Sequence, residues 1–259
     1  MKASVVVVVA ALMTMGVWVS SDAMYSNNYG DLLGDTVTFG SVTESTFTHD
    51  HALYGSPSTI GDTLRFQLTN FGQFTSGGES ALMDGMLETT ITSSPGSWIG
   101  IVRFAEYGDV SLSGSGGAAT YANVSNAIFL KITEIDGVAE NVPTLVVSTT
   151  FSPSEGTYNL ADDGILTGSP WEGVLYVDLD QYIIDLDDPL LTGHATKVEL
   201  TMDNVLNNGS EVGTSSFIRK KETDGLEITP FEVIPEPATL LILGVGGALL
   251  ALVRRGRKA

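Results

Sequence analysis

The chain has 259 residues, a formal net charge of −19 and no cysteine. A protein this acidic repels phosphate backbones, which excludes nucleic acid as a partner. Without cysteine, an oxidising compartment finds no disulfide to form and no thiol to damage.

The N-terminus has the three parts of a secretory signal peptide. Met1-Lys2 is followed by an apolar or small stretch over residues 3–19, and Ser21-Asp22-Ala23 gives the small-x-small pattern of a cleavage site. We therefore assign residues 1–23 to a signal peptide that the secretion machinery recognises. A retained N-terminal anchor is the alternative.

Residues 24–232 form the mature body that remains. They hold seven basic and 29 acidic residues, a net charge of −22, because Asp22 and Glu236 are the only acidic residues outside them. Such a body stays soluble and attracts divalent cations. About 210 residues bury one good core, and all-β domains of this length are often single units.

The body alternates apolar and polar residues with a period of two, as half-buried β-strands do. No segment before the C-terminus sustains a helical period, although 81–87 and 181–186 each have room for one helical turn. The pattern predicts a mainly β fold, an antiparallel β-sandwich or jelly roll. The alternating segments are 36–39, 63–68, 87–91, 98–104, 127–135, 144–151, 173–179 and 197–202.

Turn residues lie between these segments and tolerate positive φ. A Gly- and Ser-rich loop is expected over 111–119, and 223–234 is expected to hold the last strand. The expected turns lie at 136–137, 163–164, 207–209 and 224–225.

The histidines suggest one metal site. His49 and His51 flank Asp50, and in a strand both imidazoles would share a face about 7 Å apart. A zinc ion would need a third ligand, and His194 is the only other histidine. The alternative is a pair of exposed loop residues.

An acidic run late in the body is a weak candidate for calcium, which prefers oxygen ligands. The alternative is a solvated acidic face with no cofactor, since no glycine stands where an EF-hand loop needs one. The candidate ligands are Asp178, Asp180, Asp185, Asp187 and Asp188.

No catalytic residue is predicted. The sequence has no Gly-x-Ser-x-Gly elbow, and carboxylate pairs for glycoside hydrolysis are defined by their separation in space, which sequence does not show. Aromatic side chains offer a sugar-stacking platform, with packing in the core or on the sheet as the alternative. They are Trp98, Trp171, Tyr107, Tyr121, Tyr176 and Tyr182.

The C-terminus combines a proline-bounded motif, an apolar helix and a basic stop. Residues 238–253 are 16 uncharged residues, about 24 Å of helix against a hydrocarbon core of about 30 Å. The cations beyond them keep that end in the cytoplasm. The motif comprises Val233, Pro235, Glu236, Pro237, Ala238 and Thr239, and the membrane stop comprises Arg254, Arg255, Arg257 and Lys258.

This arrangement resembles the PEP-CTERM sorting signal of bacterial surface proteins, with motif 233–239, transmembrane helix 238–253 and basic tail 254–259. The resemblance implies an exosortase as partner, transient anchoring in the inner membrane, and release to the cell surface or outside. In that family it goes with extracellular polysaccharide, and so with a matrix or biofilm. An unprocessed anchor or a buried core helix is the alternative.

Two functions remain open. The first is a non-enzymatic exported surface or matrix protein, adhesive or carbohydrate-binding. The second is a secreted polysaccharide hydrolase or lyase on a jelly-roll scaffold, which would need two carboxylates in a groove beside an exposed aromatic side chain.

Overall fold

A computed structural model describes residues 23–232. The predicted signal peptide, except its last residue, and the predicted sorting signal 233–259 lie outside the described residues. Between residues 23 and 232, none of the helices combines the length and apolarity that a bilayer crossing requires.

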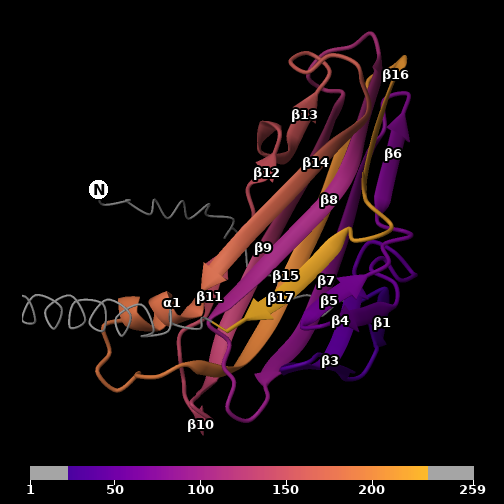
Figure 1. The fold of residues 1–259 in the computed structure, drawn as a ribbon. Helices are drawn as coiled ribbons and strands as arrows, with labels where there is room; N and C mark the ends of the chain where they lie inside the picture. The colour runs from indigo at the N-terminus through magenta and orange to yellow at the C-terminus, as the bar shows by residue number, and fades with distance from the viewer. Residues whose placement is uncertain (1–22, 233–259) are drawn as a thin grey trace, which may run out of the picture.

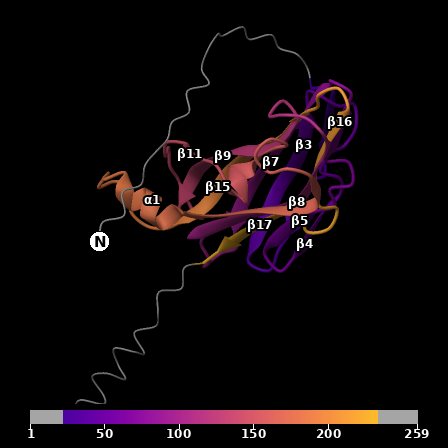
Figure 2. The ribbon, with the colours of Figure 1, turned by 90° about the horizontal axis from the view of Figure 1, so that it is seen from above.

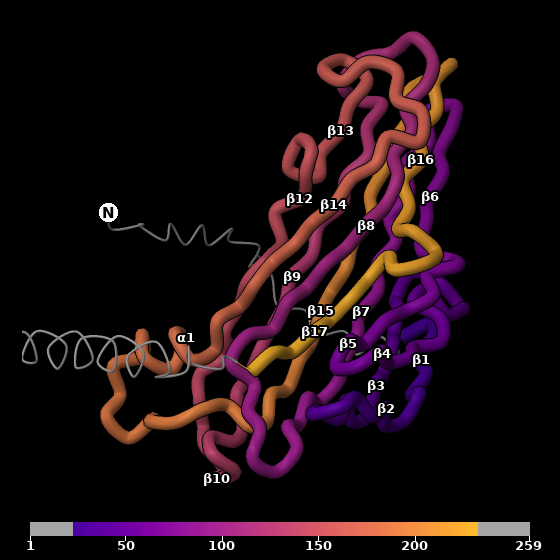
Figure 3. Tube along the Cα trace, viewed as in Figure 1, coloured from indigo at the N-terminus to yellow at the C-terminus, as the bar shows by residue number. Residues whose placement is uncertain are grey.

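The described chain forms two antiparallel β-sheets that pack face to face, as Figures 1 and 3 show. The nine-stranded sheet has the order β1-β3-β7-β15-β9-β10, with β2 beside β3 and both β11 and β13 beside β9. Its strands are β1 (Tyr25–Asn28), β2 (Leu32–Leu33), β3 (Val37–Thr46), β7 (Ser80–Ser93), β9 (Tyr121–Ile135), β10 (Val138–Ala139), β11 (Leu145–Val147), β13 (Thr157–Asn159) and β15 (Ala195–Gly209).

The eight-stranded sheet has the order β12-β14-β8-β17-β5-β4, and β16 joins β6 to β8. Two short helices, α1 (Leu179–Asp185) and the 3-10 turn η1 (Ser154–Gly156), complete the described chain. The strands of this sheet are β4 (Pro57–Ile60), β5 (Thr63–Phe66), β6 (Gly72–Ser76), β8 (Ile101–Gly114), β12 (Phe151–Ser152), β14 (Leu166–Asp178), β16 (Thr214–Lys220) and β17 (Leu226–Phe231).

The core lies between the sheets because alternate residues of each strand point inward. Leu87 and Ile91 of β7 are fully buried, and so are Val198 and Met202 of β15. Seen from above in Figure 2, β3, β7 and β9 form one layer, and β4, β5 and β8 form the other. The prediction of a mainly β fold with antiparallel sheets is confirmed.

The sandwich has two distinct ends. One end carries α1 and the turn before β10, and β6 and β16 reach toward the other (Figure 1). The turn at Asp136 and Gly137 has φ values of 49° and 78°, as the Asp-Gly pair predicts for a tight hairpin. The predicted helical turn at 181–186 falls mostly within α1.

The loop expected over 111–119 is shorter than predicted, because β8 extends to Gly114. Two other local predictions were wrong. The turn expected at 207–209 lies inside β15, where Asn208 is buried and its Nδ2 donates to the carbonyl oxygens of Ser216 and Gln73 at 3.1 and 3.2 Å. The helical turn at 81–87 is part of β7. In both places the sheet supplies the partners that the polar or small residues would otherwise find in a turn.

Candidate functional site

A depression of about 490 Å³ opens at the end of the sandwich that carries the 136–137 turn. Three segments bring residues to it. The end of β7 and the loop after it contribute Ser93 to Trp98, the end of β9 and the turn after it contribute Glu134 and Asp136, and the start of β15 contributes Thr196. We call it the Trp98 pocket.

The indole of Trp98 is fixed from the side of α1. His194 stacks on the ring with centroids 4.7 Å apart and an interplanar angle of 23°. Asp180 of α1 in turn lies 3.0 Å from Nδ1 of His194. Trp98 lines the pocket, whereas His194 does not.

Polar side chains line the pocket together with Trp98. The backbone N–H of His194 donates to Asp136 Oδ1 at 3.0 Å, and Lys197 Nζ donates to Glu134 Oε1 at 3.1 Å. The Ser93 hydroxyl donates to the carbonyl of Ser97 at 2.9 Å. An aromatic ring beside placed carboxylates and hydroxyls is the composition of a small-ligand site that both stacks and hydrogen-bonds.

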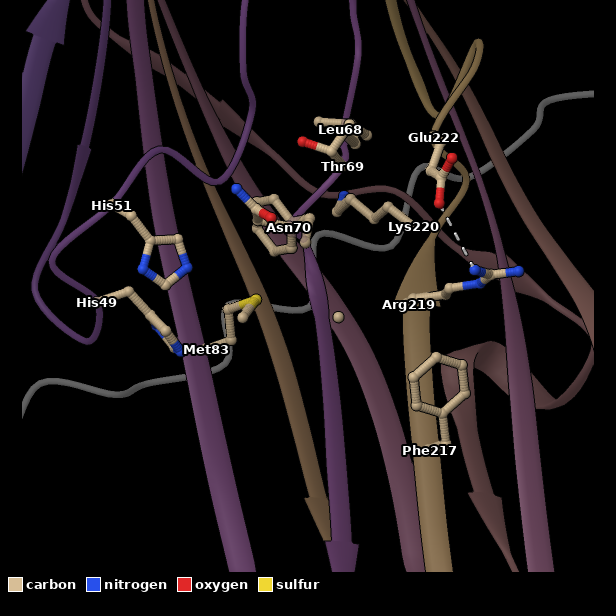
Figure 4. Close-up of a pocket in the computed structure, with 12 residues that line it drawn as sticks. His49, His51, Leu68, Thr69, Asn70, Met83, Phe217, Arg219, Lys220 and Glu222 are labelled. Carbon is tan, nitrogen blue, oxygen red and sulfur yellow. Dashed lines mark ion pairs between the residues drawn. The ribbon is translucent and has the colours of Figure 1, made fainter.

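The two sequence-neighbouring histidines line a different depression, of about 440 Å³ (Figure 4). Their rings meet edge to face at 5.4 Å, in the loop between β3 and β4. Burial lowers the pKa of His49, and the nearby His51 acts in the same direction. In Figure 4, Met83 lies beside them and the ion pair of Arg219 and Glu222 lies across the depression.

The third histidine does not join this pair, because His194 stacks on Trp98. Within residues 23–232, no three or more histidine, cysteine, aspartate or glutamate side chains are grouped as metal ligands. The histidine pair therefore lacks the third ligand that zinc requires from this set.

The acidic run takes up separate local roles around α1. Asp178 caps the helix by accepting from Gln181 N at 2.8 Å, and Asp185 accepts from Gln181 Nε2 at 2.7 Å. Asp188 accepts from Leu190 N at 3.0 Å, and Asp187 has a φ of 51°. With Asp180, which lies 3.0 Å from His194 Nδ1, the side chains of four of the five candidate aspartates have separate hydrogen-bond partners.

The candidate aromatic residues separate by burial. Trp171 is fully buried in the core, whereas Tyr176 is exposed on the outer face of the eight-stranded sheet. Tyr107 is half-buried there, within 3.4 Å of Arg103 Nη2. Only Trp98 of the six candidates lines one of the pockets described above.

A carboxylate pair that sequence reasoning missed lies on the outer face of the nine-stranded sheet. Asp84 of β7 is opposite Val205 of β15, so it is a diagonal neighbour of Asp203. Burial, the charge of Asp84 and a hydrogen bond between the two carboxyl groups raise the pKa of Asp203 to about 6. The register of β7 on β15 is what brings the pair together, and no motif marks it.

The segment 233–258 matches the family model for the PEP-CTERM protein-sorting motif. No curated protein matches the chain. Among solved structures, the chain is similar to TmCBM61 in complex with beta-1,4-galactotriose, with 7% identity and a TM-score of 0.23 over 63% of this chain and 84% of that one. It is also similar to endoglucanase 3 of Trichoderma harzianum, from family GH12, with 6% identity and a TM-score of 0.21 over 80% of this chain and 97% of that one.

Proposed function

We propose that this chain, which carries a PEP-CTERM protein-sorting motif, is a non-enzymatic exported protein of the cell surface or extracellular matrix that binds neutral polysaccharide in the Trp98 pocket. The motif implies export and exosortase-dependent processing. In the proposed route, the secretion machinery removes residues 1–23, the helix 238–253 holds the precursor in the inner membrane, and exosortase cuts near Pro235.

The single observation that supports the ligand class is the composition of the Trp98 pocket. A pyranose ring has an apolar face that stacks on an indole, and hydroxyl groups at its edge that bond to carboxylates and hydroxyls. Trp98 supplies the first, and Glu134, Asp136 and Ser93 are placed to supply the second. The stack on His194 holds the indole in one orientation, which lowers the entropy lost on binding.

Charge restricts the sugar. Two carboxylates line the pocket, and the mature body has a net charge of −22. Uronic acids and sulfated sugars would therefore be repelled. Neutral hexose polymers fit the pocket without that penalty.

Two pairs of carboxylates, one outside the Trp98 pocket and one within it, are arranged in a way that favours a binding protein over a hydrolase. Glycoside hydrolysis needs two carboxyl groups about 5–5.5 Å apart for retention or about 6.5–9.5 Å apart for inversion. Asp84 and Asp203 lie on the outer face of the nine-stranded sheet, and neither lines the Trp98 pocket. In the Trp98 pocket, Glu134 is engaged by Lys197 and Asp136 by the backbone of His194.

Binding to a glycan array, followed by calorimetry on the best neutral glycan, tests this proposal. Trp98→Ala is expected to weaken binding at least tenfold, since burial of the apolar indole is worth about 1.5 kcal/mol or more. Tyr176→Ala is the matched control, because it removes an exposed aromatic side chain outside the pocket.

Three outcomes would refute the proposal. Equal affinity of Trp98→Ala and the unaltered protein would remove the pocket as the binding site. A preference for uronic acids would contradict the charge argument. Turnover of the bound glycan would show that the protein is an enzyme.

A further inference from the structure

Three reactive side chains meet in the dry interior of the sandwich. Lys220 of β16 is 1% exposed, and Glu106 of β8 and Asn204 of β15 are 0% exposed. Lys220 Nζ donates to Asn204 Oδ1 at 2.7 Å and contacts Glu106 Oε2. Since β15 belongs to one sheet and β8 and β16 to the other, the cluster bridges the two sheets.

Aromatic rings keep water away from this cluster. The centroids of Phe71 and Trp171 lie 5.2 and 5.9 Å from Lys220 Nζ. Glycines make the space for these rings: a Cβ on Gly85 would lie 2.9 Å from Phe71 Cε2, and one on Gly108 would overlap Trp171. The backbone is therefore shaped to place aromatic walls around the amine.

The surroundings of Lys220 make its amine a better nucleophile. Burial lowers the pKa of Lys220 well below its ordinary value, so its ammonium gives up a proton more readily than that of an exposed lysine. A desolvated neutral lysine is a strong nucleophile, and a carboxyl group beside it can accept and return protons. A buried ion pair by itself often stabilises a fold no better than packed apolar residues would.

Neighbouring side chains fix the other two groups. Asn204 Nδ2 donates to the hydroxyl of Tyr54 at 3.0 Å, and that hydroxyl donates to the carbonyl of Gly85 at 2.7 Å. Asn126 Nδ2 donates to Glu106 Oε1 at 2.6 Å. The carboxamide therefore presents its oxygen to the amine, and the carboxyl group is held beside both. Fixing reactants in this way replaces a costly encounter in solution.

We propose that Lys220 and Asn204 join spontaneously in an intramolecular isopeptide bond, with Glu106 as the catalytic proton carrier. Glu106 first accepts a proton from the lysine ammonium. The neutral Nζ then attacks Cγ of Asn204, a new Nζ–Cγ bond forms, and the Cγ–Nδ2 bond breaks. Glu106 delivers its proton to Nδ2, which leaves as ammonia, and receives one of the two protons of Nζ, so the new amide keeps one N–H. No oxidant or reductant is needed.

Such a bond would join the nine-stranded sheet to the eight-stranded sheet covalently. The chain has no cysteine and so cannot use a disulfide for this purpose. The bond would also survive the reducing and oxidising conditions that a surface protein meets. It is independent of the glycan ligand proposed above.

Peptide mapping of the full chain tests the bond directly. A protease that cleaves after glutamate separates residues 200–211, which contain Asn204, from residues 212–222, which contain Lys220. In the proposed state these two fragments stay joined, with a combined mass lower by one ammonia than the sum of the separate fragments. Fully separate fragments would overturn the proposal, and so would a cross-link that has lost water and maps to Glu106.

A variant tests the proton carrier. Glu106→Gln keeps the shape of the side chain but removes the proton acceptor, and the fragments are expected to separate completely. Glu172→Gln, at an exposed position on the neighbouring β14, is the matched control and should stay joined. A folded Glu106→Gln protein that is fully joined would refute the role of Glu106.

If Glu106→Gln does not fold, Glu106→Asp gives the second test. It keeps a carboxyl group but withdraws it by one methylene, so the joined fraction should rise at least tenfold more slowly after refolding. A rate equal to that of the unaltered protein would refute the role of Glu106 by itself.

Discussion

The carboxyl pair of Asp203 and Asp84 makes the stability of the fold depend on pH, and Asp203→Asn removes that dependence. The pKa of Asp203 is raised from 3.8 to about 6 in the folded chain. The folded state therefore holds this proton more tightly than the unfolded state. Its contribution to stability is fully present below about pH 4 and is lost as the pH rises through about 6.

The size of the effect follows from the same shift. A difference of about 2 pKa units corresponds to roughly 3 kcal/mol at most. Because Asp203 is half-buried and partly reached by solvent, screening reduces the expected effect to about 1 kcal/mol. Relative to the unaltered protein, Asp203→Asn should therefore gain about 1 kcal/mol of unfolding free energy between pH 4 and pH 7.

Urea unfolding of both proteins at pH 4 and pH 7 measures this double difference. Glu199→Gln is the matched control, since Glu199 is exposed on the same face of β15 and its substitution changes the net charge equally. A gain for Glu199→Gln as large as that for Asp203→Asn would show that overall charge, and not the carboxyl pair, is responsible. No gain for Asp203→Asn would refute the claim that the folded chain binds the proton of Asp203 more tightly than the unfolded chain.

Three further predictions follow from particular contacts. Asp180→Asn weakens the contact with His194, which stacks on Trp98. Calorimetry should show a loss of glycan affinity of about threefold, smaller than the loss for Trp98→Ala. An unchanged affinity would show that α1 does not support Trp98 through His194. Gly108→Ala places a Cβ against Trp171 and against the backbone oxygen of Arg219, and it should lower the unfolding free energy by about 1–3 kcal/mol in urea. A neutral effect would mean that both the ring and the neighbouring strand can shift. Tyr54→Phe removes the hydroxyl that holds Asn204. After refolding, the bond between Asn204 and Lys220, followed as joined fragments 200–211 and 212–222, should form about tenfold more slowly. An unchanged rate would show that packing alone positions the carboxamide.

The strands could be predicted from sequence because their apolar residues alternate, but their lengths could not. β8 and β15 have 14 and 15 residues, longer than the predicted segments 98–104 and 197–202. Buried Glu106 and Asn204 interrupt the apolar face of these strands and end the visible pattern. The same two residues lie beside Lys220, so the buried polar residues that interrupt the strand pattern are also those proposed to react.

The candidate site could be predicted only in part. Trp98 was one of six aromatic candidates, and its residue type does not distinguish it from Trp171 in the core. Asp136, which lines the same pocket, follows β9, and His194, which stacks on Trp98, precedes β15; the register of the two strands brings Asp136 and His194 together. The acidic run at α1 was recognised as a cluster, but its helix cap and its bond to His194 depend on the local backbone.

Mass spectrometry of the protein from its native host tests the central claim of export and sorting most directly. We expect a mature species that begins at Met24 and lacks the segment 238–259, because the signal peptide is removed and exosortase cuts near Pro235. Recovery of a chain that still contains residues 238–259, from a host that has an exosortase, would contradict the claim.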